Sequence, residues 1–262
     1  MPAQGRFRLD FGNLPLIEAA VRATLSAKVP LTYAIVDSVR ARLSSSFPLL
    51  TEPQQLEVAP GVGHVVLEGG PSYLPGAVFT GHAEGLSVSV HPQVVVARWV
   101  KQYIPAETNY PRYPKLREAI WGTVESFRQG VGAESFPALS VVNMSYVNFL
   151  PQADPTSIRS YLSARAYLPA FQNARQIRKH EASWSEEEGL DVRFALEQVT
   201  AKLGTQLSEG YRLTTAAGLR LAESVDAKSG LDRVHDVLQG FFLSLISDKA
   251  TREWKLEKVP VE

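Results

Sequence analysis

Apolar residues in the first half of the chain follow strand spacing and helix spacing in turn. Ile17–Lys28 alternates in part between apolar and polar positions, which favours a strand. Pro30 then begins a helix that is predicted to run to about Ser45, and a second amphipathic helix is predicted over Tyr113–Gln129. The segments predicted as strands between these helices are Gln55–Ala59, His64–Leu67, Gly76–His82, Leu86–His91 and Val94–Val100.

The second half repeats this order of elements. A strand is predicted over Leu139–Leu150, and Asp154-Pro155 begins a short helix that ends near Leu162. A long hairpin follows, and Ser229-Gly230-Leu231-Asp232 has the spacing of a capping box at the start of the last helix, which is predicted to end near Ile246. The segments predicted as strands of the second half are the hairpin arms Arg175–Trp184 and Leu190–Val199, and Tyr211–Glu223, interrupted near Gly218.

These patterns predict an α+β fold built from two similar halves. Each half contains a strand, a helix, antiparallel strands and a long helix, with a curved antiparallel sheet packed on the helices. The predicted halves are residues 1–133 and 134–262, a pseudo-repeat that is also compatible with one compact unit. Consecutive hairpins argue against a parallel, doubly wound sheet.

The amino-acid composition indicates a protein with a core and excludes some classes of partner and site. The chain has 262 residues, of which 45% are hydrophobic and 21% are charged, enough apolar content for a substantial core. Lys and Arg number 27 and Asp and Glu number 27, so the chain lacks the net positive charge of a dedicated nucleic-acid binder. Near-neutrality also permits self-association. There is no Cys, which excludes disulfides, thiolate zinc sites and cysteine nucleophiles and fits a reducing compartment.

Hydropathy predicts a cytoplasmic protein with no membrane partner. No apolar run approaches the roughly 20 residues that span a bilayer. Met1–Leu16 lacks the continuous apolar stretch of a signal peptide.

Motifs for cofactor, phosphate or metal chemistry are missing. The chain contains no G-x-x-x-x-G-K-[ST], H-E-x-x-H or G-x-S-x-G pattern, and none of its five His residues has ligand spacing with another. Gly61-Val62-Gly63 lies between predicted strands, where it is interpreted as a turn. We therefore expect neither a cofactor nor a metal.

Three polar residues of the second half are candidates for binding. Asn148 ends a predicted strand beside Tyr146, where it either contacts a ligand or, as the simpler alternative, orders the following turn as a buried amide. His235 has Asp232 three residues before it and Asp236 next to it, which suits an oriented base or part of a one-turn metal site; the simpler alternative is that the two carboxylates complement the helix dipole.

Other candidates carry charge or aromatic surface. His180 belongs to a basic stretch with Arg175, Arg178 and Lys179. Strand alternation places Arg178 and His180 on one face and Arg175 and Lys179 on the other. Asp248 and Lys249, after the last predicted helix, are candidate binding residues whose simpler role is local capping and pairing. The residues predicted as partly exposed interface anchors are Trp184 and Trp254.

Several fragments resemble a sporadically distributed bacterial family of uncharacterised proteins. They are Pro15-Leu16-Ile17-Glu18-Ala19, Tyr146-Val147-Asn148, Asp154 with Tyr161-Leu162, Leu231-Asp232-x-x-His235 and Ile246-Ser247-Asp248-Lys249 with Arg252. Phe149 departs from the family pattern, in which a basic residue commonly follows the Asn. The resemblance implies no activity and no catalytic residue; the patchy occurrence of the family implies an accessory gene, for example in defence or in a toxin–antitoxin system.

Together these patterns favour a non-catalytic protein whose sheet surface, or the cleft between its halves, binds a partner, either another protein or a second copy. One alternative is an enzyme acting on nucleotides or RNA, with a site between the halves that includes Asn148, His180 and His235. Another alternative is a nucleic-acid-binding regulator.

Overall fold

The computed structural model describes residues 7–11, 15–51, 74–81, 85–102, 109–150, 160–163, 179–203, 205–222 and 224–260. Several predictions fall outside these residues: the strands Gln55–Ala59 and His64–Leu67, the turn Gly61-Val62-Gly63, the helix start at Asp154-Pro155, and Arg175 and Arg178 of the basic stretch.

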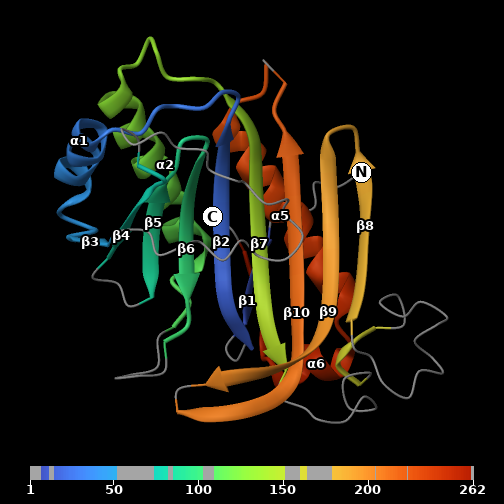
Figure 1. The fold of residues 1–262 in the computed structure, drawn as a ribbon. Coiled ribbons are helices and arrows are strands. Elements are labelled where there is room, and N and C mark those ends of the chain that lie inside the picture. Colours follow the sequence, from blue (N-terminus) through green and yellow to red (C-terminus); the bar gives the residue numbers. More distant parts are fainter. Residues whose placement is uncertain are drawn as a thin grey trace. The chain divides into compact units, whose positions relative to one another are not determined.

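The described residues form strands and four helices (Figure 1). The helices are α1 (Tyr33–Leu43), α2 (Arg112–Val131), α5 (Ala227–Leu245) and α6 (Asp248–Glu253). The strands are β1 (Phe7–Phe11), β2 (Leu16–Leu25), β3 (Leu49–Thr51), β4 (Ala77–Thr80), β5 (Leu86–Val90), β6 (Val94–Val100), β7 (Leu139–Leu150), β8 (Lys179–Glu187), β9 (Leu190–Leu203), β10 (Gln206–Arg220) and β11 (Leu256–Pro260).

Antiparallel pairing organises the strands. Nine of them follow the order β3-β4-β5-β6-β2-β7-β10-β9-β8, and β1 and β11 form a separate pair. The pairs β3–β4, β4–β5, β5–β6, β8–β9 and β1–β11 are all antiparallel. The predicted α+β class with an antiparallel sheet is therefore confirmed.

The chain divides into two compact units. Unit 1 comprises residues 1–18, 145–217 and 232–262, and unit 2 comprises residues 19–144 and 218–231. The predicted duplication into residues 1–133 and 134–262 stays a prediction.

Unit 2 packs α1 and α2 with the strands β4, β5 and β6. Alternation places Leu86, Val88 and Val90 of β5 on one buried face, opposite Trp99, Ala97 and Val95 of β6. Gly85, which directly precedes β5, has φ 84°, a backbone angle that glycine adopts without steric cost. α1 begins at Tyr33, later than the predicted start at Pro30, because the Thr32 side chain caps it by accepting a hydrogen bond from Ile35 N at 3.3 Å.

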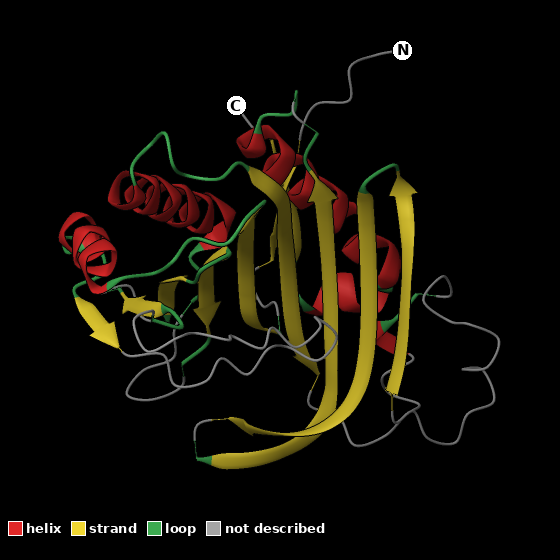
Figure 2. Cartoon of the chain, turned by 45° about the horizontal axis from the view of Figure 1, so that its top comes forward, coloured by secondary structure: helices red, strands yellow, loops and turns green. Residues whose placement is uncertain are grey.

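Unit 1 packs one side of α5 against its long strands (Figure 2). Its apolar cluster combines residues of β7, β9, β10, α5 and α6 with Leu162. These residues are Leu150, Leu162, Phe194, Leu196, Tyr211, Leu213, Phe242, Leu245, Ile246, Ala250 and Trp254. The alternating residues of β9 and β10 that enter this cluster define the face of the strands that α5 covers.

Two local predictions are wrong. α5 begins at Ala227, before the predicted capping box, because Asp226 Oδ2 accepts hydrogen bonds from both the N–H and the hydroxyl of Ser229 at 2.9 Å. These bonds lower the pKa of the Asp226 carboxyl. β10 also continues through Gly218 without a break. This glycine provides space instead, since a Cβ there would lie 2.1 Å from Asn143 Nδ2.

The pairing of β1 with β11 has no counterpart in the predictions. Phe7 lies opposite Pro260 and Phe11 lies opposite Leu256. Both strands have only five residues, and their partnership joins segments almost 250 positions apart, so local periodicity cannot detect it.

Candidate functional site

A short segment, Ser160–Ser163, docks onto the junction between α5 and α6 in unit 1. Leu162 and Ile246 form an isolated antiparallel bridge. Ser163 N donates to Leu245 O at 2.7 Å, and Ser247 N donates to Tyr161 O at 2.9 Å. Two backbone bonds thus fix the segment before any side chain is considered.

Ser247 strengthens this junction with its hydroxyl. It is the N-cap of α6, with extended backbone angles, and its Oγ accepts from Ala250 N at 3.2 Å. The same hydroxyl donates to Ser160 O at 2.5 Å. One side chain therefore begins α6 and attaches it to the docked segment.

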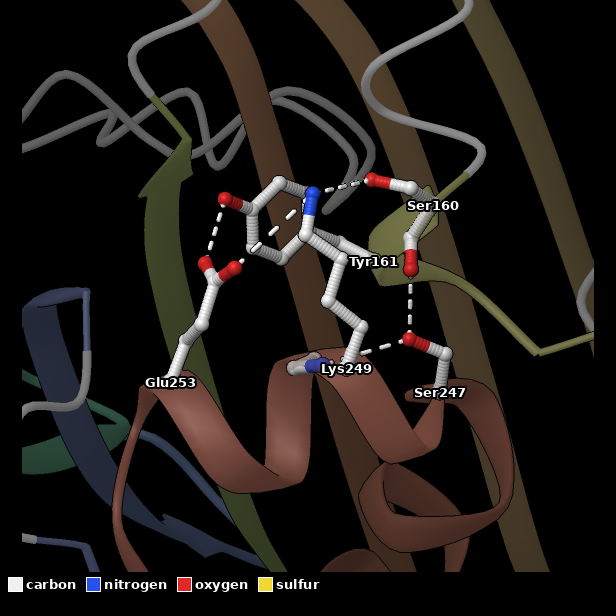
Figure 3. Close-up of polar contacts among 6 residues, drawn as sticks. Ser160, Tyr161, Ser247, Lys249 and Glu253 are labelled. Carbon is white, nitrogen blue, oxygen red and sulfur yellow. Dashed lines mark hydrogen bonds and ion pairs between the residues drawn. The ribbon is translucent and has the colours of Figure 1, made fainter.

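Lys249 is the centre of the polar contacts on this junction (Figure 3). Its Nζ donates to Ser160 Oγ at 2.9 Å, lies 4.6 Å from the centroid of the Tyr161 ring and is 3.8 Å from Glu253 Oε1. The Tyr161 hydroxyl donates to Glu253 Oε2 at 2.6 Å. We call Ser160, Tyr161, Ser247, Lys249 and Glu253 the α6 cluster.

The contacts of the α6 cluster attach segments that are distant in the sequence. Lys249 Nζ lies beside the Glu253 carboxylate and over the Tyr161 ring, so an ion pair and a cation–π contact hold its side chain in place. The cluster holds the Ser160–Ser163 segment to α6.

Trp254 lies beneath this cluster and is only 6% exposed, so its prediction as a partly exposed anchor is wrong. Its ring stacks on Tyr161, with centroids 5.8 Å apart, and on Phe242, at 6.2 Å. Because α6 ends at Glu253 and Trp254 N donates to Ala250 O, the indole is directed back into the apolar cluster.

Asp248 occupies the first turn of α6 and is exposed. A carboxylate at this position complements the partial positive charge of a helix N-terminus. Asp248 and Lys249 thus lie in a helix of their own and not in a tail after α5.

Asn148 is a buried amide on β7, 1% exposed, whereas Tyr146 on the same strand is half-buried. Strand alternation places Asn148 on the same side as Leu150, which belongs to the apolar cluster under α5. Thr215 lies on the corresponding face of β10, two residues beyond Leu213, and is 0% exposed. Within the described part of the chain, Asn148 Oδ1 and Thr215 Oγ1 have no hydrogen-bond partner.

His235 lies on the buried side of α5, 8% exposed, seven residues before Phe242 and therefore on the same side of the helix. Its Nδ1 lies 3.4 Å from Asp236 Oδ1. Among the described residues no group of three or more His, Asp or Glu side chains could hold a metal ion.

His180 lies near the start of β8 and faces the apolar side of the hairpin. Its ring centroid is 5.8 Å from that of Phe194, and its backbone is opposite Leu196. Desolvation lowers the pKa of His180. The structure thus separates this histidine from Lys179, as alternation predicts.

Charged residues occupy the other face of β8, β9 and β10. Lys179 Nζ lies 3.4 Å from Glu181 Oε2, and Glu181 also pairs with Arg193 of β9. Glu197 of β9 pairs with Arg212 of β10. Lys179, Arg193 and Arg212 are therefore each paired with a carboxylate.

Trp184 is the large aromatic residue at the surface of this hairpin. It is 38% exposed, which confirms the prediction of partial exposure. Its ring meets Phe241 of α5 edge-to-face, with centroids 4.9 Å apart and an angle of 76° between the rings. Its Nε1 donates to Glu186 Oε1 at 2.9 Å.

The candidate residues lie on separate elements of the fold. Asn148, His180 and His235 lie on β7, β8 and α5, whereas Lys249 is drawn into the α6 cluster. Sequence reasoning missed Ser160 and Glu253, which contact Lys249 and Tyr161. Ser247-Asp248 is a sequence signal for a helix N-terminus, so the start of α6 could have been predicted. No sequence signal indicates the contact between Lys249 and Ser160, which lies 89 positions earlier.

No protein-family model matches the chain, and no curated protein matches it. Among the described helices, none combines the length and the apolar character needed to cross a membrane.

Proposed function

We propose that this chain is a non-catalytic interaction protein that binds another protein through the β8–β9 hairpin of unit 1. Trp184 is the observation that carries the proposal. An exposed tryptophan at the surface of a hairpin is the type of residue that dominates binding energy at protein interfaces.

The Trp184 side chain is held in place before binding. Phe241 contacts the ring from α5, and Glu186 accepts the indole N–H. Because both torsions of the side chain are restrained, a partner would lose little conformational entropy by ordering it. Preorganised aromatic side chains of this kind are efficient anchors.

Polar groups next to the anchor in the sequence provide a rim. The Ser185 hydroxyl donates to Asp191 Oδ1 at 2.6 Å, and Glu187 pairs with Arg233 of α5. Interfaces commonly place such satisfied polar groups around a central aromatic residue. The hairpin therefore offers an anchor and a rim on one continuous element.

Neither alternative function has comparable support. Lys249 is engaged by Ser160, Tyr161 and Glu253 of the α6 cluster, and the basic residues Arg193 and Arg212 are paired with carboxylates. A groove for nucleic acid requires a positive field along its length, which paired charges weaken.

Site-specific photo-crosslinking in the native host tests the proposal. A photoreactive phenylalanine analogue would replace Trp184 in one variant and Tyr33 in a control variant, since Tyr33 is a 72% exposed aromatic residue on α1. We expect a light-dependent protein adduct of discrete mass at position 184 and none at position 33. The proposal would be overturned if no adduct formed at position 184, or if the same adducts formed at positions 184 and 33.

We place this interaction protein in the cytoplasm and in a bacterial accessory system such as defence. The cytoplasmic assignment rests on the absence of Cys, and the accessory role rests on the family resemblance of fragments such as Tyr146-Val147-Asn148. Deletion of the gene followed by phage challenge of the host tests the defence role: unchanged plaque numbers would contradict it.

A further inference from the structure

We infer that the partner of the β8–β9 hairpin is a second copy of this chain, whose β8 pairs antiparallel with β8 of the first copy around a two-fold axis at Ser183. The inference rests on the proposed function, because it names the occupant of the same surface. Three features of β8 support it: its place at the edge, its pattern of charge and its pattern of size.

β8 is an edge strand. It ends the strand order of the described residues, where β9 is its neighbour. Along the strand, Lys179, Glu181 and every residue from Ser183 to Glu187 are exposed. An edge strand directs alternate backbone N–H and C=O groups away from its neighbour, where they can pair with another strand. The pairing of β8 with β9 is regular from Lys179 to Ser185 and shifts in register between Ser185 and Glu187, so seven residues centred near Ser183 give the row of such groups.

Charge along β8 is self-complementary when two copies run antiparallel. Lys179 is at one end, and Glu186 and Glu187 are at the other. With Ser183 opposite itself, the Lys179 end of each copy meets the glutamate end of the other. Opposite charges across neighbouring strands stabilise pairing, whereas a parallel arrangement would bring like ends together.

Repulsion between the acidic residues is limited by pairs within each copy. Glu181 pairs with Arg193 of β9, and Glu187 pairs with Arg233 of α5. The whole chain has a formal net charge of zero, so two copies approach without a long-range barrier.

The same register matches a large side chain with a small one. Trp184 of one copy lies opposite Ala182 of the other, and both positions are on the side of β8 that α5 covers. The exposed part of the indole would rest over the alanine methyl group and leave water. This register explains why the exposed tryptophan is one residue away from the centre of the strand.

The chain's lack of cysteine makes the register directly testable. Ser183→Cys introduces a single thiol on the proposed axis. Directly opposed residues of antiparallel strands have Cα atoms about 4.5–5.5 Å apart, which permits a disulfide between copies.

Ser185→Cys is the matched control, because it has the same side chain on the same exposed face of the same strand. In the proposed register, Ser185 lies opposite Glu181, so its own counterpart is four residues away, at roughly 13 Å. That distance is too long for a disulfide.

Under mild oxidation of the purified full-length chain, we expect Ser183→Cys to form a covalent dimer at least about tenfold faster than Ser185→Cys. Sedimentation of the unaltered chain supplies a measurement that needs no variant, and we expect a concentration-dependent dimer. Lys179→Glu should raise the dissociation constant by about tenfold, since it places a like charge at each end of the strand pair.

Equal rates of disulfide formation at 183 and 185, or an unaltered chain that stays monomeric at about 100 μM, would overturn self-pairing. The photo-crosslinker at position 184 separates this failure from failure of the proposed function. Adducts with a different protein in cells would keep the proposed function and reject the second copy. No adduct at all, in cells or with the purified chain, would reject both.

Discussion

Gly76 lies so close to the His91 imidazole that a Cβ at position 76 would be 2.3 Å from His91 Nδ1. The imidazole is 6% exposed, with Nδ1 3.2 Å from Pro75 O and Nε2 3.1 Å from Ser89 Oγ. Burial lowers the pKa of His91, and the hydrogen bond to Pro75 opposes that shift only in part. The missing side chain of Gly76 is what allows a titratable ring into the core of unit 2.

The burial of His91 predicts a loss of stability in acid. Because the pKa is lower in the folded chain, the unfolded chain takes up a proton first as the pH falls. The contribution of His91 to the free energy of unfolding should be constant well above about pH 6.5 and should decrease below it, until the folded pKa is passed. Urea denaturation at a series of pH values measures this.

His91→Gln is the variant that identifies the group responsible. It should have a shallower decrease in the free energy of unfolding below about pH 6.5 than the unaltered chain. His180→Gln serves as a comparison, since the pKa of His180 is also lowered but its ring is less buried. An unchanged slope in His91→Gln would contradict the prediction.

Gly76→Ala should destabilise unit 2 by about 1–3 kcal/mol, because the added methyl group overlaps the His91 ring and lies 3.1 Å from Val90 O. Thermal denaturation measures the change. A double-mutant cycle with His91→Ala provides the control: if the ring is the obstacle, the effect of Gly76→Ala should become smaller in the His91→Ala background. Strict additivity of the two substitutions would contradict this account.

The α6 cluster predicts different costs for two substitutions of Tyr161. Tyr161→Phe removes the hydroxyl that donates to Glu253 and should cost about 0.5–1.5 kcal/mol. Tyr161→Ala also removes the ring beneath Lys249 and beside Trp254 and should cost about 3–5 kcal/mol. Urea denaturation distinguishes the two, and equal effects would mean that the ring does not attach the Ser160–Ser163 segment.

Thr215 offers an opportunity to stabilise unit 1. Thr215→Val replaces the buried hydroxyl, which has no partner among the described residues, with a methyl group of similar shape. We expect a gain of up to about 1 kcal/mol, because burying an unsatisfied hydroxyl is unfavourable. Thr215→Ser is the matched control: it keeps the hydroxyl, loses a methyl group and should cost about 1 kcal/mol.

Regular elements with a continuous pattern were predicted closely from the sequence. Val94–Val100 and Leu139–Leu150 form strands with those bounds, and Tyr113–Gln129 lies within α2. In each of these segments the period of apolar residues persists over seven or more positions, so burial and local preference indicate the same element.

Features set by distant residues could not be predicted in this way. A glycine inside a strand commonly marks a break, but Gly218 instead accommodates Asn143, which lies 75 positions earlier. The contact between Ser160 and Lys249 depends on Ser163 and Ser247 bonding to backbone groups across the α5–α6 junction. These relationships arise from tertiary packing, and neither residue of a pair carries a local signal for them.

The interleaving of the two units constrains how the chain is made. Passage from one unit to the other occurs at positions 18/19, 144/145, 217/218 and 231/232, which lie inside β2, β7, β10 and α5. On the ribosome, residues 19–144 are synthesised long before residues 218–231, which complete unit 2. Unit 1 is complete only after residues 232–262 have been synthesised. A nascent chain arrested before β10 therefore lacks part of both units, and premature termination there should yield a product that is cleared by proteases and not a usable fragment.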